Sequence, residues 1–194
     1  MALDRLKLDV CYWIPCLPWQ KDSRELARPE QRLAMLELAL KGEVSMQIDT
    51  CELDRERPSY SIETIREFKK RFPNDELFFL LGSDQWQNFD SWRDWQAILK
   101  SVHPVIFTRA GAPLNTSEAV NTFVQDESIS LQVIRCALPK LSSTQIRKMI
   151  SQDTQLFDKL APTVLPGAVL EYIEQNKLYR HSNIEGNSNE LIGH

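Results

Sequence analysis

Three consecutive hydroxyl side chains and an arginine stand close together late in the chain, in the segment Leu141-Ser142-Ser143-Thr144-Gln145-Ile146-Arg147. The segment opens a predicted helix over 143–151, and a helix start offers unpaired N–H groups and a partial positive charge to an anion. Hydroxyls with a guanidinium one turn later therefore suit a phosphate group. The same residues fit a capping box, in which the side chains of Ser142 and Gln145 each accept a hydrogen bond from the other residue's backbone N–H. The segment alone leaves both interpretations open.

A second candidate follows the predicted buried strand over 77–81. Gly82 allows a ligand to approach the backbone closely, and the Asp84 carboxylate can accept hydrogen bonds from ribose hydroxyls. Ligands bind at the carboxyl ends of strands in open parallel sheets, which is where this segment stands. A plain turn followed by a helix cap explains the same residues equally well.

Cations follow two other predicted strands. Lys21 lies in the loop after the strand over 10–14, and Arg109 follows the strand over 105–108. Both could meet phosphate at the edge of the sheet that binds ligands. An exposed linker is the alternative for the Lys21 loop, and that segment alone favours the linker.

Aromatic residues cluster between 85 and 95. In a predicted helix over 91–100, Trp92 and Trp95 share one face with Ile98, so at least one of them should pack in the core. A ring at the mouth of a cleft could instead stack on a heteroaromatic ligand. Both uses remain open from the sequence.

The elements that position these residues alternate between strands and helices. This alternation predicts an α/β fold with a parallel sheet covered by helices on both faces. We expect one domain over 1–180 and a disordered polar tail over 181–194. The predicted strands span 10–14, 46–51, 77–81, 105–108 and 131–136, and the predicted helices span 28–41, 61–72, 91–100, 143–151 and 167–175.

Composition narrows the function classes. With 42% hydrophobic and 26% charged residues the chain is an ordinary globular protein, and its net charge of −4 argues against general nucleic-acid or membrane-surface binding. No apolar run approaches the length of a membrane span, and the N-terminal residues show no signal-peptide core. Four cysteines and three histidines show no zinc spacing, so free thiols in the cytoplasm are the simplest interpretation. No G-x-G-x-x-G, no P-loop and no nucleophile–histidine pair is present.

Several segments, in this order, resemble the motifs of bacterial nicotinate-nucleotide adenylyltransferases, which make the dinucleotide precursor of NAD. The segment 141–147 is similar to the family's I-S-S-T-x-I-R motif, and 80–84 with Ser91-Trp92 is similar to its I-I-G-x-D…S/T-W segment. The likeness extends from residue 1 to about 180, and its remaining parts are 28–35, 58–64 (family P-S-Y-T-x-D-T) and 165–179.

The resemblance implies a Rossmann-like nucleotidyltransferase fold and roles for particular residues. It implies that Mg²⁺ and ATP act with nicotinate mononucleotide, with no nucleic acid or membrane as partner, and it is compatible with a homo-oligomer. The implied ATP-binding residues are Ser143, Thr144 and Arg147 at the phosphates and Gly82 and Asp84 by the adenosine. The implied mononucleotide-binding residues are Trp92 at the nicotinate ring, Ser61 at its carboxylate, and Lys21 and Arg109 at its phosphate.

The chain departs from the family at its start. It lacks the family's first strand and the G-G-T-F-D-P-x-H-x-G-H loop, so no catalytic residue can be carried over. Residues 1–6 resemble the end of the helix after that loop. In the family's strand order, 3-2-1-4-5, the missing strand is central, so the strands over 10–14 and 77–81 should each keep an unpaired edge. We therefore interpret the sequence as an N-terminally shortened form whose own turnover is in question.

Smaller departures and two alternative functions accompany this interpretation. Gln20 stands where the family has His, Ser61 replaces Thr, and Glu63 replaces Asp. One alternative is a relative of phosphopantetheine adenylyltransferase, which Trp92 and the P-S-Y segment disfavour. The other is a non-catalytic nucleotide-binding module that has lost the histidine loop.

Overall fold

The computed structural model describes residues 2–16, 26–56, 59–109, 111–136, 142–152 and 164–180. The chain divides into two compact units, of which one holds residues 1–21 and 40–140 and the other holds residues 22–39 and 141–194. Each unit is described by itself. No helix in the described part of the chain is long and apolar enough to cross a membrane.

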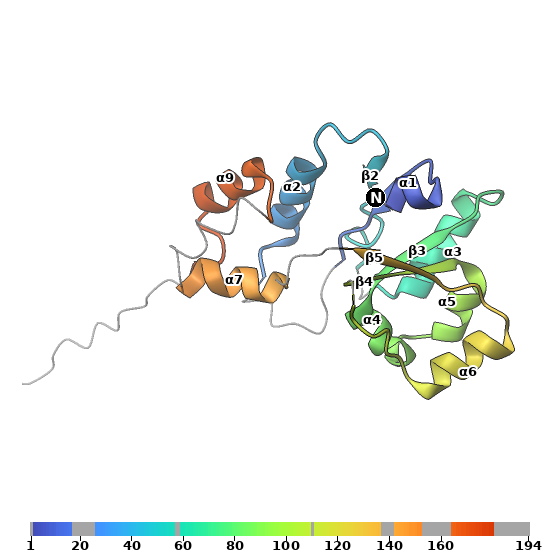
Figure 1. The fold of residues 1–194 in the computed structure, drawn as a ribbon. Coiled ribbons are helices and arrows are strands. Elements are labelled where there is room, and N and C mark those ends of the chain that lie inside the picture. The colour runs from blue at the N-terminus through green and yellow to red at the C-terminus, as the bar shows by residue number, and fades with distance from the viewer. Residues whose placement is uncertain are drawn as a thin grey trace, which may run out of the picture. The chain divides into compact units, whose positions relative to one another are not determined.

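The first unit is built on parallel strands (Figure 1). One sheet pairs β1 (Cys11–Trp13) with β2 (Met46–Ile48), and the other has the order β3-β4-β5, formed by Phe78–Gly82, His103–Arg109 and Gln132–Cys136. Within the described residues, the edge of β1 away from β2 and the edge of β3 away from β4 pair with no strand. The predicted α/β class with parallel strands is thus confirmed.

Helices of the first unit cover the three-stranded sheet. Leu81 of β3 and Ile106 of β4 are aligned on one face, and they join a core that includes Trp86 and Phe89, which are 1% and 0% exposed. The opposite face of β4 is also buried, since Val105 is 0% exposed. The helical elements of this unit are α1 (Ala2–Leu6), α3 (Ser61–Arg71), α4 (Ser83–Gln87), the short 3₁₀ helix η2 (Phe89–Ser91), α5 (Trp95–Ser101) and α6 (Glu118–Asp126).

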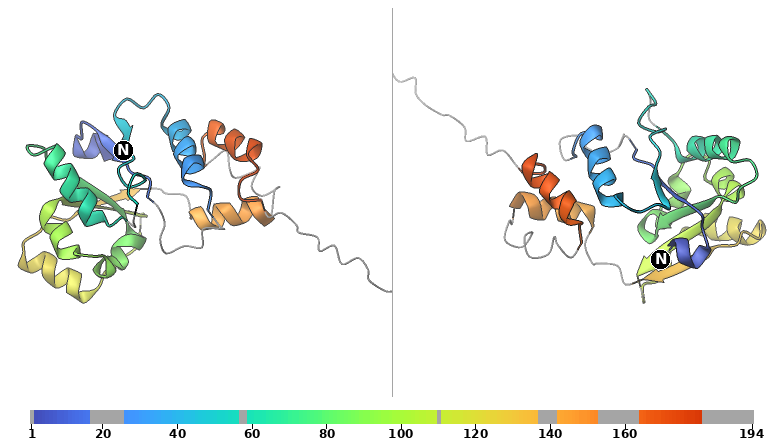
Figure 2. Two further views of the ribbon diagram at one scale, coloured as in Figure 1. Left: turned by 180° about the vertical axis from the view of Figure 1, so that it is seen from behind. Right: turned by 90° about the horizontal axis from the view of Figure 1, so that it is seen from above.

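The second unit contains α7 (Ser143–Gln152), α9 (Gly167–Gln175) and nearly all of α2 (Pro29–Leu40), drawn in orange, red and blue in Figure 2. Their common apolar core is built on Ile150, Val169 and Ile173, with Met35 and Leu38 of α2 packed against it. These helices match the predicted ranges closely, because their apolar residues recur at helical spacing.

Two predicted elements differ from the structure. The helix predicted over 91–100 is wrong at its start, because Trp92 is extended (φ −80°, ψ 140°) and Asp94 adopts the left-handed conformation (φ 52°), so α5 begins at Trp95. The strand predicted over 46–51 ends at Ile48, where a turn begins in which the Leu53 N–H donates to the Thr50 carbonyl at 2.8 Å. Helix α6 was not predicted, and the predicted tail over 181–194 lies outside the described residues.

Candidate active site

Gly82 stands where β3 ends and α4 begins. It is the N-cap of α4, and its N–H donates to the Gln85 side-chain oxygen at 3.2 Å. A Cβ built on Gly82 would collide with Oδ1 of Asp84, whose carboxylate folds back over this glycine and is exposed. Only glycine therefore leaves the Asp84 carboxylate where it stands, beside a backbone that a ligand can approach. The alternative of a turn and a cap is also realised here, since Gly82 caps α4.

Arg109 ends the neighbouring strand, β4. Because Gly82 is aligned with Phe107, Arg109 lies two residues beyond that pair, at the carboxyl ends of the same strands, and its side chain is exposed. The preceding residue, Thr108, is fully buried, and its hydroxyl has no hydrogen-bond partner among the described residues. The structure thus brings the predicted Gly82 segment and Arg109 to one sheet edge, as parallel pairing requires.

Trp92 follows η2 and is half-buried. Its ring lies 5.3 Å from that of Phe89 and makes an edge contact with Phe79, with centroids 6.2 Å apart. Phe89 in turn contacts the buried Trp86 at 5.2 Å. A stack of rings therefore supports Trp92 from the core, while part of its own ring remains accessible. Both predicted uses of the aromatic cluster, core packing and an accessible ring, are compatible with this arrangement.

Ser61 is the first residue of α3, and its side chain is half-buried. The helix is preceded by Tyr60 in an extended conformation (φ −110°, ψ 137°), whose ring lies under the Arg93 guanidinium at 4.5 Å. Since Arg93 follows Trp92 directly, this contact links the turn that carries Ser61 with the segment that carries Trp92. Such a cation–π contact is worth about 0.5–1 kcal/mol at an exposed site.

In the second unit, the start of α7 forms the predicted capping box. The Ser142 N–H donates to the Gln145 side-chain oxygen at 2.7 Å, and the Gln145 N–H donates to the Ser142 hydroxyl at 3.2 Å. The hydroxyls of Ser143 and Thr144 take no part in the box, and both residues are exposed. Arg147 is half-buried, and its guanidinium donates to the Thr144 hydroxyl at 3.2 Å.

Sequence reasoning missed Tyr179, whose phenol feels the charges of Arg147 and Arg32. Burial raises the pKa of the Tyr179 phenol, while the positive charges of Arg147 and Arg32 and a hydrogen bond with the backbone of Ala27 act in the opposite direction. The Tyr179 phenol therefore lies within reach of the positive charges of both Arg147 and Arg32. Helical spacing could not have shown this, because the three side chains come from segments far apart in the chain.

Comparison with known proteins identifies the family. Residues 1–149 match the cytidylyltransferase-like family model. The chain is 35% identical over 175 residues to a probable nicotinate-nucleotide adenylyltransferase of Borreliella afzelii, covering 90% of this chain and 83% of the relative. A probable nicotinate-nucleotide adenylyltransferase of Methylacidiphilum infernorum is 31% identical over 180 residues, covering 92% and 81%. The chain belongs to the nicotinate-nucleotide adenylyltransferase family.

A solved structure supports the fold of this family member. The nicotinic acid mononucleotide adenylyltransferase of Plasmodium falciparum, complexed with NaAD, matches with a TM-score of 0.68 at 17% identity and covers 92% of this chain and 88% of its own. At that identity the likeness concerns the Rossmann-like fold alone. The relatives named above are probable nicotinate-nucleotide adenylyltransferases, which favours this family over a phosphopantetheine enzyme and over a non-catalytic module.

The roles expected for the site residues from the resemblance to this family stay predictions. Lys21 lies outside the described residues. In the part of the chain that the structure describes, no three His, Cys, Asp or Glu side chains lie close enough together to hold a metal ion. Ser143, Thr144 and Arg147 belong to one unit, whereas Ser61, Gly82, Asp84, Trp92 and Arg109 belong to the other.

Proposed function

We propose that the chain transfers the adenylyl group of ATP to nicotinate mononucleotide, which yields nicotinate adenine dinucleotide and pyrophosphate. A phosphate oxygen of the mononucleotide attacks the α-phosphorus of ATP in line with the leaving group. The new P–O bond forms as the bond to the β-phosphate breaks, and pyrophosphate leaves with the electron pair. No protein nucleophile takes part, so catalysis rests on positioning and on stabilising negative charge.

In this proposal, ATP is held by two groups of residues. Ser143, Thr144 and Arg147 bind its phosphates, with the guanidinium supplying charge-assisted hydrogen bonds. Gly82 and Asp84 accommodate the adenosine, where the carboxylate accepts from the ribose hydroxyls. Magnesium enters as the Mg·ATP complex, because Mg²⁺ keeps several waters and binds substrate phosphate oxygens readily.

The mononucleotide is bound by the other predicted residues. Trp92 stacks on the nicotinate ring, Ser61 lies at its carboxylate, and Arg109 and Lys21 meet its phosphate. The stack of rings behind Trp92 supports its part in this proposal, since it leaves that ring partly accessible. A cytoplasmic location fits as well, because the four cysteines, all within the described residues, are not joined in disulfides.

The observation that carries the proposal is the family match over 90% of the chain, together with a capping box that leaves two hydroxyls and Arg147 available. The test measures pyrophosphate release with Mg·ATP and nicotinate mononucleotide, and binding of a non-hydrolysable ATP analogue by calorimetry. Arg147→Ala should weaken nucleotide binding by roughly 10- to 160-fold, as expected for a lost charge-assisted contact of about 1.5–3 kcal/mol.

Lys148→Ala is the matched control, because it removes an exposed cation from the next position of the same helix. Successive residues of a helix point in different directions, so this change should alter nucleotide binding less than twofold. Equal losses in the two variants would show that α7 contributes only general positive charge. Unchanged nucleotide affinity in Arg147→Ala would overturn the assigned phosphate site.

A further inference from the structure

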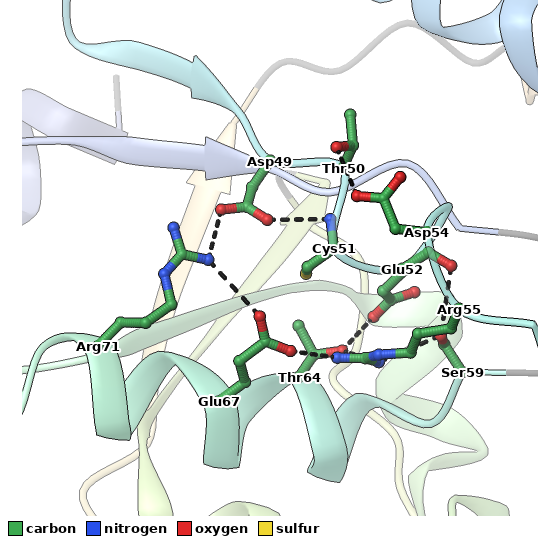
Figure 3. Close-up of polar contacts among 10 residues, drawn as sticks. All are labelled: Asp49, Thr50, Cys51, Glu52, Asp54, Arg55, Ser59, Thr64, Glu67 and Arg71. Carbon is green, nitrogen blue, oxygen red and sulfur yellow. Dashed lines mark hydrogen bonds and ion pairs between the residues drawn. The ribbon is translucent and has the colours of Figure 1, made fainter.

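A network of polar side chains joins the segment after β2 to helix α3 (Figure 3). At its centre, the Arg55 guanidinium donates through Nη1 to the Ser59 hydroxyl at 3.1 Å and to the Thr64 hydroxyl at 2.9 Å. Through Nη2 it donates to the Glu67 carboxylate at 2.7 Å. The Arg55 side chain is only 17% exposed, so these contacts are shielded from solvent more than a surface ion pair would be.

Glu52 completes the network through Thr64, whose hydroxyl also accepts from Arg55. Its carboxylate accepts from the Thr64 hydroxyl at 2.6 Å and is 8% exposed, and its backbone carbonyl accepts from the Ser59 hydroxyl at 3.5 Å. A buried carboxylate is costly unless charge and hydrogen bonds compensate it, and the nearby Arg55 supplies the opposite charge. The arginine is therefore held in one orientation by partners on several sides.

The Ser59 hydroxyl is the point at which this network meets the proposed mononucleotide site. Ser59 stands two residues before Ser61, and the residue between them, Tyr60, carries Arg93 on its ring. A shift of Ser59 would therefore move the start of α3 and the support of the segment after Trp92 together. The network reaches both proposed contacts of the nicotinate ring without touching either residue.

We propose that Arg55 is a positioning residue for nicotinate mononucleotide, acting by holding Ser59 and, through it, the turn that carries Tyr60 and Ser61. This inference rests on the proposed function. A guanidinium is suited to the role because its planar fork fixes several acceptors at once. A lysine ammonium at the same position could reach fewer of them and in a less defined geometry.

Steady-state kinetics test the inference. Arg55→Ala should raise the KM for nicotinate mononucleotide about tenfold or more, while the KM for ATP changes less than about threefold, because only the mononucleotide contacts lie on the displaced turn. Arg55→Lys should fall between Arg55→Ala and the unaltered protein, and it also serves if Arg55→Ala folds poorly. A change in thermal stability without the selective rise in KM would overturn the inference.

Arg71→Ala is the matched control. Its guanidinium belongs to the same network and contacts Asp49 at 2.6 Å and Glu67 at 3.8 Å, but Arg71 is the last residue of α3, at the opposite end of the helix from the turn over 59–61. The control should lose some stability while keeping both KM values within about twofold of the unaltered protein. If it raised the mononucleotide KM as much as Arg55→Ala does, the effect would belong to helix α3 in general, and the inference would fail.

Hydrogen exchange separates this inference from the proposed function. The amides of residues 59–62 should exchange about tenfold faster in Arg55→Ala than in Arg71→Ala, because local opening follows the loss of the contacts that hold a segment. Absence of turnover in the unaltered protein would contradict the proposed function, whereas the exchange rates would still test whether Arg55 holds the turn over 59–61. Equal exchange at these amides in both variants would overturn the role of Arg55.

Discussion

Gly82→Ala offers a test of the proposed adenosine site that depends on one atom. The backbone of Gly82 has φ −77° and ψ 153°, which any residue adopts, so alanine introduces no backbone strain. Its methyl group would instead collide with Oδ1 of Asp84 and lie 3.6 Å from the Asp84 Cγ. The substitution should therefore act by driving the carboxylate out of its present orientation.

The size of the effect follows from separate contributions to folding and binding. Forcing a side chain away from its rotamer costs about 0.5–1.5 kcal/mol, and replacing glycine by alanine at a compatible position returns about 0.4–1 kcal/mol. The free energy of unfolding should thus change by less than about 1 kcal/mol. Losing charge-assisted hydrogen bonds to ribose would cost about 1.5–3 kcal/mol of binding, which corresponds to roughly a 10- to 160-fold rise in the Kd for ATP.

The assay is a double-mutant cycle with Gly82→Ala, Asp84→Ala and the pair, each titrated with a non-hydrolysable ATP analogue in a calorimeter. Asp84→Ala removes the atom with which the new methyl group collides, so Gly82→Ala should have little further effect in that background. If the penalty of Gly82→Ala persisted without the carboxylate, the methyl group would be acting on the nucleotide or the backbone. That result would refute the reasoning.

Three further predictions concern other parts of the first unit. Phe89→Leu should cost about 1–3 kcal/mol of unfolding free energy, because the smaller side chain loses the ring contacts with Trp86 and Trp92, each worth about 0.5–1.5 kcal/mol. Loss of the Trp92 contact should also raise the KM for nicotinate mononucleotide roughly 2- to 12-fold; urea unfolding and kinetics measure both, and an unchanged KM would contradict it. Burial, then the hydrogen bond and charge of Asp49, raise the pKa of the Cys51 thiol to about 12. Iodoacetamide at mildly alkaline pH should therefore modify the exposed Cys16 well before Cys51, as followed by mass spectrometry, and equal rates of modification would refute this. Burial acts to raise the pKa of Asp49, but hydrogen bonds with Cys51 and a neighbouring guanidinium outweigh burial and lower the pKa. The ionised Asp49 carboxylate therefore stabilises the fold above the unfolded pKa of about 3.9, and this stabilisation is lost as pH falls through the lower folded pKa. Asp49→Asn should lack that acid-dependent loss of stability in urea titrations.

The sequence was sufficient for the strands and long helices, whose patterns are local. The parallel strands follow from short apolar runs separated by helical segments, and both unpaired sheet edges were expected. Helix α6 was missed although Ser117 accepts from the Val120 N–H and Phe123 follows at helical spacing, so a usable signal existed. The start of α5 could not be predicted from the sequence, because the helical spacing of apolar residues continues through Asp94, whose left-handed conformation interrupts the helix.

The positions of candidate site residues could be predicted where they depend on strand pairing alone. Gly82, Asp84 and Arg109 were placed correctly at the strand ends, since parallel pairing fixes which residues share an edge. The Arg55 network was not predicted, because its partners are 4 to 12 residues away and their contacts depend on how the turn after β2 folds onto α3. Side-chain networks of this kind arise from tertiary packing, and no periodicity encodes them.

The capping box and the proposed phosphate site at the start of α7 depend on the same helix geometry. Residues three and four apart share a face of a helix, so Ser143 and Thr144 necessarily stand beside Arg147 once the helix is formed. The box fixes where that helix begins, using the Ser142 hydroxyl and the Gln145 side chain and leaving the next two hydroxyls outside it. Replacing Gln145 should therefore loosen the helix start and weaken nucleotide binding indirectly, whereas replacing Thr144 should weaken binding with the helix intact. The two alternatives that the sequence leaves open thus support one another.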